Sequence, residues 1–178
     1  MAGRREEKRG KTAPMVGIVG GSKTDFPVLE KTVMILDQLG IPNELVVLSA
    51  HRTPDQLSQY VEQAAGRGIE VIVAGAGGAA ALPGVVAAKT HLPVIGLPIP
   101  TENLRGLDSL LSIVQMPKGV PVATVAIGGA ENAGLLAAQI LAVRYPAIRD
   151  KVIQFRAEQT RAVLDSSRGS KNEPTKPR

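Results

Sequence analysis

The sequence predicts a three-layer α/β sandwich, in which a parallel β-sheet is covered by helices on both faces. Two features of the chain lead to this prediction. Short apolar runs of the kind that form buried strands recur along the chain, and segments with a helical spacing of apolar residues lie between them. Because alternating strands and helices are joined by right-handed crossovers, neighbouring strands are expected to run parallel.

Five apolar runs are interpreted as the strands of this sheet. Each is short and rich in β-branched or aliphatic side chains, which is typical of a strand buried on both faces. The runs span residues 15–20, 44–49, 70–74, 93–97 and 122–127. Because only 2% of the residues are aromatic, aliphatic side chains must supply nearly all of the packing.

The helical segments begin and end at recognisable signals. Asp25 is placed as the N-cap of the first helix and Gly40 as its end. Thr53 and Gln56 have the spacing of a capping box at the start of the second helix. Three further helices are expected near residues 80–89, 132–143 and 148–164.

The basic residues gather at the two ends of the chain. The 178 residues are the size of one domain, and their formal net charge is +5. Residues 1–14 and 166–178 each carry +3, which leaves about −1 for residues 15–165. We therefore expect two disordered basic tails around a single domain. A nearly neutral body with few aromatic residues argues against nucleic-acid binding.

The composition excludes several other classes of protein. There is no cysteine, so disulfides, thiolate metal sites and cysteine nucleophiles are excluded. The N-terminal stretch lacks the apolar core of a secretory signal, and no apolar run approaches the ~20 residues of a membrane helix. We therefore expect a cytoplasmic protein with no membrane partner.

The segments that follow the strands are the candidates for chemistry, because parallel sheets bind ligands beyond the carboxyl ends of their strands. The first such loop contains Gly20, Gly21 and Ser22, just before the first helix. Glycines let backbone amides approach a ligand, and a helix N-terminus attracts phosphate. The alternative interpretation of this loop is an ordinary cap and turn.

The second loop places Ser49, His51 and Arg52 before another helix start. The planar guanidinium of Arg52 suits phosphate oxygens, and an imidazole transfers protons near neutral pH. The combination favours a phosphate site with His51 as its proton-transfer group. The alternative is a surface salt bridge for Arg52 and a strand-capping role for His51.

The third loop starts with Gly75, Ala76 and Gly77 and matches a dinucleotide-binding glycine pattern. This loop follows the third strand rather than the first, and no acidic residue closes a following strand about 20 residues later, so a dinucleotide site is not expected. The small residues favour a flat wall on which main-chain groups contact a planar heterocycle. Tight packing of helix on sheet would require the same residues.

Two further features lie outside these three loops. Residues 105–117 mix apolar residues with Gly, Ser and Asp, and they are interpreted as a lid or a subunit contact. His91 precedes the fourth strand, away from the expected site. The two histidines lack the spacing of a metal motif, so no metal site is expected.

Four motifs in order give the chain a specific resemblance. They are GSKTD at residues 21–25, SAHRTP at 49–54, AGAGGAA at 74–80 and DSLLSIVQMP at 108–117. Together they resemble the PurE family. The resemblance implies a flavodoxin-like sheet, a homo-octamer with sites at subunit contacts, no metal or organic cofactor, and a single PurE-like catalytic domain over residues 15–165.

The resemblance also implies an activity and a binding mode. Class I members are isomerases of de novo purine synthesis that convert N5-carboxyaminoimidazole ribonucleotide into 4-carboxyaminoimidazole ribonucleotide. By position, Ser22, Ser49 and Arg52 are expected to contact the nucleotide phosphate, and Asp25 the ribose hydroxyls.

The resemblance places the chemistry on the second and third loops. The backbone of Gly75 and Ala76 is expected to contact the imidazole, and His51 matches the family's catalytic histidine. Ala81 and Leu82 are also expected to line the substrate site. Ala81 is a departure, because class I members usually carry there a histidine that is thought to contact the migrating carboxylate.

Two alternatives to the mutase follow from these residues. A class II-like enzyme would carboxylate or decarboxylate aminoimidazole ribonucleotide, or another heteroaromatic nucleotide, directly. The alanine at position 81 also fits a weakly catalytic nucleotide-binding paralogue. The class I form of the loop at residues 75–80 favours the mutase.

Overall fold

The chain folds around a five-stranded parallel sheet. The computed structural model describes residues 13–169. The strand order is β2-β1-β3-β4-β5, which is the flavodoxin-like order and confirms the predicted fold. The strands are β1 (Val16–Gly20), β2 (Asn43–Val47), β3 (Val71–Ala76), β4 (Val94–Pro98) and β5 (Ala123–Thr124).

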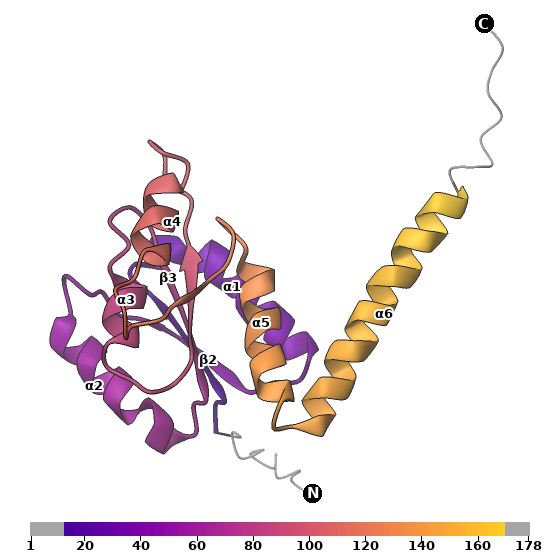
Figure 1. Cartoon of the computed structure of the whole chain (residues 1–178), viewed down its shortest axis with the longest axis horizontal. Helices are drawn as coiled ribbons and strands as arrows, with labels where there is room; N and C mark the ends of the chain where they lie inside the picture. Colours follow the sequence, from indigo (N-terminus) through magenta and orange to yellow (C-terminus); the bar gives the residue numbers. More distant parts are fainter. Residues whose placement is uncertain (1–12, 170–178) are drawn as a thin grey trace, which may run out of the picture.

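Helices cover both faces of the sheet (Figure 1). One buried cluster packs the sheet against α1 and α5, and a second packs it against α2, α3 and α4. Two short 3₁₀ turns, η1 (Lys23–Asp25) and η2 (Ala65–Arg67), adjoin α1 and α2. The helices are α1 (Phe26–Gln38), α2 (Pro54–Ala64), α3 (Leu82–Ala87), α4 (Leu107–Val114), α5 (Ala130–Ala142) and α6 (Pro146–Gly169).

Helix α6 extends away from the body of the molecule (Figure 1). Ile148 and Val152 on its first turns are buried in the α1 and α5 cluster, whereas Ile153 and Leu164 are exposed. The helix ends at Gly169, four residues beyond the predicted domain boundary at residue 165. Residues 1–12 and 170–178 of the predicted tails lie outside the described residues.

Two elements differ from the sequence prediction. The strand predicted over residues 122–127 pairs with β4 only at Ala123 and Thr124, and beyond them single hydrogen bonds, such as the one from the Val125 N–H to the Gly96 carbonyl, replace the ladder. The segment interpreted as a lid or subunit contact contains a regular helix, α4. It starts after Gly106, whose φ of 95° suits glycine.

The two predicted N-cap positions are confirmed, Asp25 before α1 and Thr53 before α2, but neither side chain makes the capping hydrogen bond to its helix. The capping box lies one turn earlier, at η1: the Ser22 hydroxyl accepts the Thr24 N–H at 3.3 Å, while the Asp25 carboxylate accepts the Ser22 N–H at 2.9 Å. The Thr53 hydroxyl accepts the N–H of Ser49 at 2.8 Å instead of an N–H of α2. Both hydroxyl groups therefore bond within the loops that follow β1 and β2.

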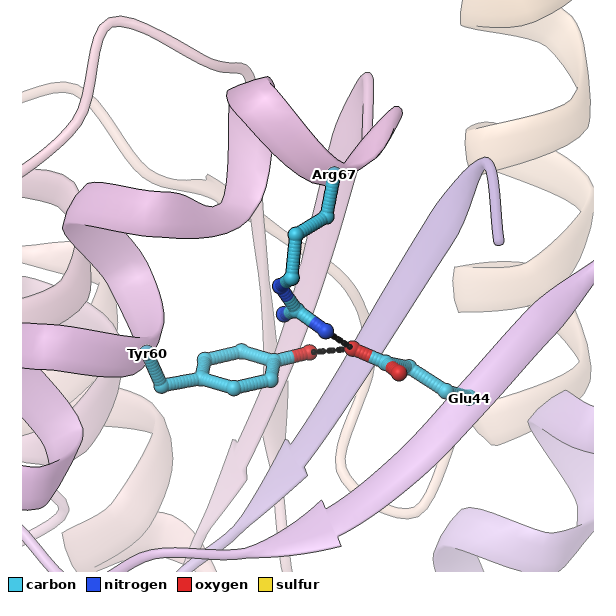
Figure 2. Close-up of polar contacts among 3 residues, drawn as sticks. All are labelled: Glu44, Tyr60 and Arg67. Carbon is cyan, nitrogen blue, oxygen red and sulfur yellow. Dashed lines mark hydrogen bonds and ion pairs between the residues drawn. The ribbon is translucent and has the colours of Figure 1, made fainter. Parts of the chain in front are cut away.

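A polar cluster ties the edge strand β2 to the helix layer (Figure 2). Glu44 accepts a hydrogen bond from the Tyr60 hydroxyl at 2.9 Å and lies 2.7 Å from an Arg67 guanidinium nitrogen. The Arg67 guanidinium also stacks 4.7 Å from the centre of the Tyr60 ring. Burial and the neighbouring Glu44 carboxylate raise the pKa of Tyr60, so its hydroxyl stays a donor.

No helix within residues 13–169 is both long enough and apolar enough to span a membrane.

Candidate active site

The parallel register brings the ends of four strands level with one another. Gly20 of β1 pairs with Val47 of β2 and Gly75 of β3, and Gly75 pairs in turn with Leu97 of β4. The loops that follow these strands enclose a pocket of about 440 Å³. The pocket lies at the switch point between β1 and β3, where ligands bind in sheets of this order.

The first loop contributes a hydroxyl and a carboxyl group. Ser22 and Asp25 both line the pocket, and the hydrogen bond from the Ser22 N–H holds the Asp25 carboxylate in place. Asp25 is buried, and this burial raises the pKa of its carboxyl group above the ordinary 3.8. Backbone hydrogen bonds from Ser22 and Gly21 and the charge of Arg52 oppose the shift without cancelling it.

The second loop contributes the cationic and imidazole groups. The buried Ser49 hydroxyl accepts hydrogen bonds from the backbone N–H and the Nε–H of Arg52, at 3.2 and 3.3 Å. The Arg52 Nη2 donates to the Gly21 carbonyl at 2.8 Å, which joins the second loop to the first. His51 has an exposed side chain that lines the same pocket.

The third loop forms a wall of small residues. Ala76, Gly77, Ala81 and Leu82 line the pocket, together with Ala79 and Ala80. Gly75 does not line it. A Cβ at Gly75 would lie 2.7 Å from a methyl group of Leu29, so packing under the sheet accounts for this glycine.

A fourth wall was missed by the sequence analysis. The pocket is also lined by the three residues that follow β4, which are Ile99, Pro100 and Thr101. The sequence could have indicated these residues, because ligands bind beyond the carboxyl ends of parallel strands, and this rule applies to the fourth strand as well. Thr24 and Ala50, in two loops already chosen, were also missed.

The pocket therefore unites eight of the nine residues that the sequence analysis selected. Gly75 is the exception, and His91 precedes β4 at the other end of the sheet from the pocket. Within residues 13–169, no group of three or more His, Cys, Asp or Glu side chains is placed to hold a metal ion. The eight pocket residues are Ser22, Asp25, Ser49, His51, Arg52, Ala76, Ala81 and Leu82.

The fold and the pocket define a flavodoxin-like α/β protein with its ligand site at the β1/β3 switch point. The family model described as AIR carboxylase matches residues 15–162, and the chain belongs to this family. The crystal structure of Treponema denticola PurE superimposes with a TM-score of 0.81 at 27% sequence identity, over 90% of this chain and 99% of that one.

Curated relatives carry a more specific name. The N5-carboxyaminoimidazole ribonucleotide mutase of Pseudomonas aeruginosa is 61% identical over 85% of this chain and 94% of its own length. The enzymes of the same name from Saccharolobus solfataricus and Thermotoga maritima are 58% and 57% identical, each over 86% of this chain and over 97% and 90% of their own lengths. These similarities confirm the PurE resemblance found in the sequence.

Proposed function

We propose that this chain is an isomerase of de novo purine synthesis that converts N5-carboxyaminoimidazole ribonucleotide into 4-carboxyaminoimidazole ribonucleotide. The observation that carries the proposal is the 61% identity to a mutase of this name over nearly all of that enzyme's length. Residues 15–165 are the proposed catalytic domain.

The proposed binding mode divides the nucleotide between the first two loops. Ser22, Ser49 and Arg52 hold the phosphate, because hydroxyl and guanidinium donors converge where these two loops are bonded together. The Asp25 carboxyl group accepts hydrogen bonds from the ribose hydroxyls. Neutralisation of the phosphate by Arg52 and by neighbouring backbone N–H groups would supply most of the affinity.

The proposed reaction takes place against the third and fourth loops. The bond between N5 and the carboxyl carbon breaks and N5 takes a proton from the protonated His51 imidazole, which releases carbon dioxide beside aminoimidazole ribonucleotide. C4 then attacks the trapped carbon dioxide, and His51 takes the C4 proton to restore the aromatic ring. An enclosed pair of reactants has an effective molarity that can reach ~10⁵ M, which makes recapture faster than escape.

The backbone of Ala76 is proposed to contact the imidazole ring from the small-residue wall, where it lines the pocket. Gly75 was expected to share this contact, but it lies in β3 packed against Leu29 and does not line the pocket, whereas Ala76 and Gly77 do. Ala81 and Leu82 at the end of the same loop are proposed to border the migrating carboxylate.

A second candidate function is direct carboxylation or decarboxylation of aminoimidazole ribonucleotide. The family description, AIR carboxylase, favours this candidate.

One assay separates the two candidates. The purified chain is incubated either with N5-carboxyaminoimidazole ribonucleotide or with aminoimidazole ribonucleotide and bicarbonate. The mutase forms the 4-carboxy product from the first substrate, at a rate that added bicarbonate does not raise. Turnover that occurs only with the second mixture would make the chain a carboxylase.

A third arm tests the weakly catalytic paralogue. Calorimetric binding of aminoimidazole ribonucleotide without turnover of either substrate, and without restoration of turnover by Ala81→His, would identify a nucleotide-binding paralogue. Turnover by the parent chain removes this alternative.

The proposal extends to assembly and location. We expect a homo-octamer in the cytoplasm, in line with the family resemblance. Exposed apolar side chains on α4 and α6, among them Leu111 and Ile153, support an assembly of copies.

A further inference from the structure

Helix α4 buries a serine and exposes two of its three leucines. Ser109 has no exposed surface, whereas Leu107 and Leu111 are 50% and 47% exposed. Burial of a hydroxyl group is unfavourable unless it is hydrogen-bonded, so a serine in this place points to a polar role. The partners of that hydroxyl show what the role is.

The Ser109 hydroxyl joins two walls of the pocket. It accepts the Gly78 N–H at 3.0 Å and donates to the Ile99 carbonyl at 2.8 Å. Gly78 belongs to the small-residue loop after β3, and Ile99 follows β4. One buried side chain therefore fixes the third loop against the fourth, from behind the pocket.

The third loop depends on such a support because its own backbone is weakly bonded. Gly78 and Ala80 have positive φ values of 70° and 27°, the second of which is uncommon for a residue with a side chain. The Ala80 N–H reaches the Gly77 carbonyl only at 3.4 Å. Held by few internal bonds, this turn takes its position from α4: Ser109 accepts the Gly78 N–H at 3.0 Å, and the Ser112 hydroxyl reaches the Gly78 carbonyl more weakly, at 3.4 Å.

A neighbouring residue holds the fourth loop. The Asp108 carboxylate accepts the Thr101 hydroxyl at 2.8 Å, and the Thr101 oxygen accepts the Gly106 N–H at 3.1 Å. Thr101 lines the pocket. The first turn of α4 thus anchors both walls that face the proposed heterocycle, and Ser109 is its fully buried member.

We propose that Ser109 is a positioning residue for the reaction, which sets the small-residue wall against which the imidazole ring and carbon dioxide lie. This inference rests on the proposed function. Because the phosphate contacts lie on the first two loops, loss of the Ser109 hydroxyl should disturb the chemical step more than nucleotide binding. A displacement of about 1 Å at a reacting centre costs up to ~10²-fold in rate.

The test compares Ser109→Ala with the parent chain in two measurements. In amide hydrogen exchange, Gly78 in the variant should exchange about 3- to 10-fold faster, the effect of one lost hydrogen bond, while the core strands keep their protection. In steady-state kinetics with N5-carboxyaminoimidazole ribonucleotide, kcat should fall about 10- to 100-fold and KM should stay within about twofold.

Ser58→Ala is the matched control, because the Ser58 hydroxyl bonds only the Pro54 carbonyl within α2, remote from the loop. It should leave both measurements unchanged. Ser109→Cys, which keeps nearly the same volume but bonds weakly, replaces Ser109→Ala in both measurements if the alanine variant does not fold.

Unchanged exchange at Gly78, or a kcat equal to that of the parent, overturns the inference. So does a rise in KM at constant kcat, because it would place Ser109 in substrate binding alone. If the parent chain does not turn over the substrate, the proposed function fails, and exchange at Gly78 then decides by itself whether Ser109 holds the wall.

Discussion

At the residue scale, the proposed reaction depends on one imidazole. His51 lines the pocket beside Arg52 and Ser49, and its exposed side chain is free to meet a bound ring. Loss of a positioned general base costs about 10²–10⁴ in rate. We predict that His51→Asn lowers kcat by about this factor, while calorimetry finds nucleotide affinity within a few-fold of the parent, because the proposed phosphate contacts remain.

His91→Asn is the control for this prediction, because His91 is also exposed but lies before β4, away from the pocket. It should retain the parent rate. Full activity in His51→Asn would refute the proton-transfer role.

The fold alters the ionisation of Asp25. The pKa of its carboxyl group is raised, so ionisation of this group costs more in the folded chain than in the unfolded chain. Below the ordinary pKa of 3.8 the group is protonated in both states and the cost is absent. As the pH rises through the raised folded-state pKa, the cost appears in full and stability is lost.

We therefore predict that Asp25→Asn raises the denaturant midpoint at pH 7 and that this gain disappears below about pH 4. The same variant should bind the nucleotide less tightly, because the ribose loses its carboxylate partner. Denaturation series at several pH values measure the first effect and calorimetry the second. A variant less stable than the parent at neutral pH would contradict the account of Asp25.

At the scale of elements, the polar cluster between β2 and the helix layer can be disrupted by a substitution on β1. A Cβ on Gly17 of β1 would lie 2.6 Å from the Tyr60 hydroxyl, so Gly17→Ala must push that hydroxyl away from Glu44. We predict a destabilisation of about 1–3 kcal/mol, as for other overpacked sites, measured by denaturant unfolding.

A double-mutant cycle isolates the cause. In a Tyr60→Phe background the hydroxyl is gone, so Gly17→Ala should cost clearly less. Equal costs in the two backgrounds would show that Ile69, whose methyl group lies 3.2 Å from the same Cβ position, is the true obstacle.

Helix α4 shows why one element escaped the sequence analysis. Leu107, Leu111 and Val114 have helical spacing, yet all three are exposed, and the buried face carries Ser109 and Ile113. Because apolar residues lie on the exposed face as well as on the buried one, no wholly polar face marks this segment as an amphipathic helix. The capping hydrogen bonds were misjudged because the Ser22 and Thr53 hydroxyls bond within loops whose shape only the folded chain reveals.

At the scale of the whole molecule, the layers and the strand ends could be predicted, because buried parallel strands and their crossover helices leave a clear pattern in the chain. The same rule located the three loops, and the family resemblance added Asp25, Ala81 and Leu82 to the eight pocket residues. It could not separate Ala76, which faces the pocket, from Gly75, whose missing side chain makes room for Leu29. Such contacts join residues far apart in sequence and have no local signal.

The exposed apolar faces of α4 and α6 lead to a prediction about assembly. Light scattering after gel filtration should find one species with about eight times the 18.6 kDa mass of the chain. Leu111→Glu, which puts a charge on the exposed face of α4, should lower that mass because burial of a charge in the core of an interface is unfavourable. A parent chain that runs at 18.6 kDa would contradict the octamer.

In the proposed mechanism, the four loops hold carbon dioxide beside the nucleotide until it is recaptured. The most direct measurement follows substrate labelled with ¹³C in its N5-carboxyl group, in buffer that contains unlabelled bicarbonate. We predict that the 4-carboxy product retains most of the label, because the trapped fragment does not mix with solvent. Product that carries mainly unlabelled carbon, or the absence of product, would contradict the account.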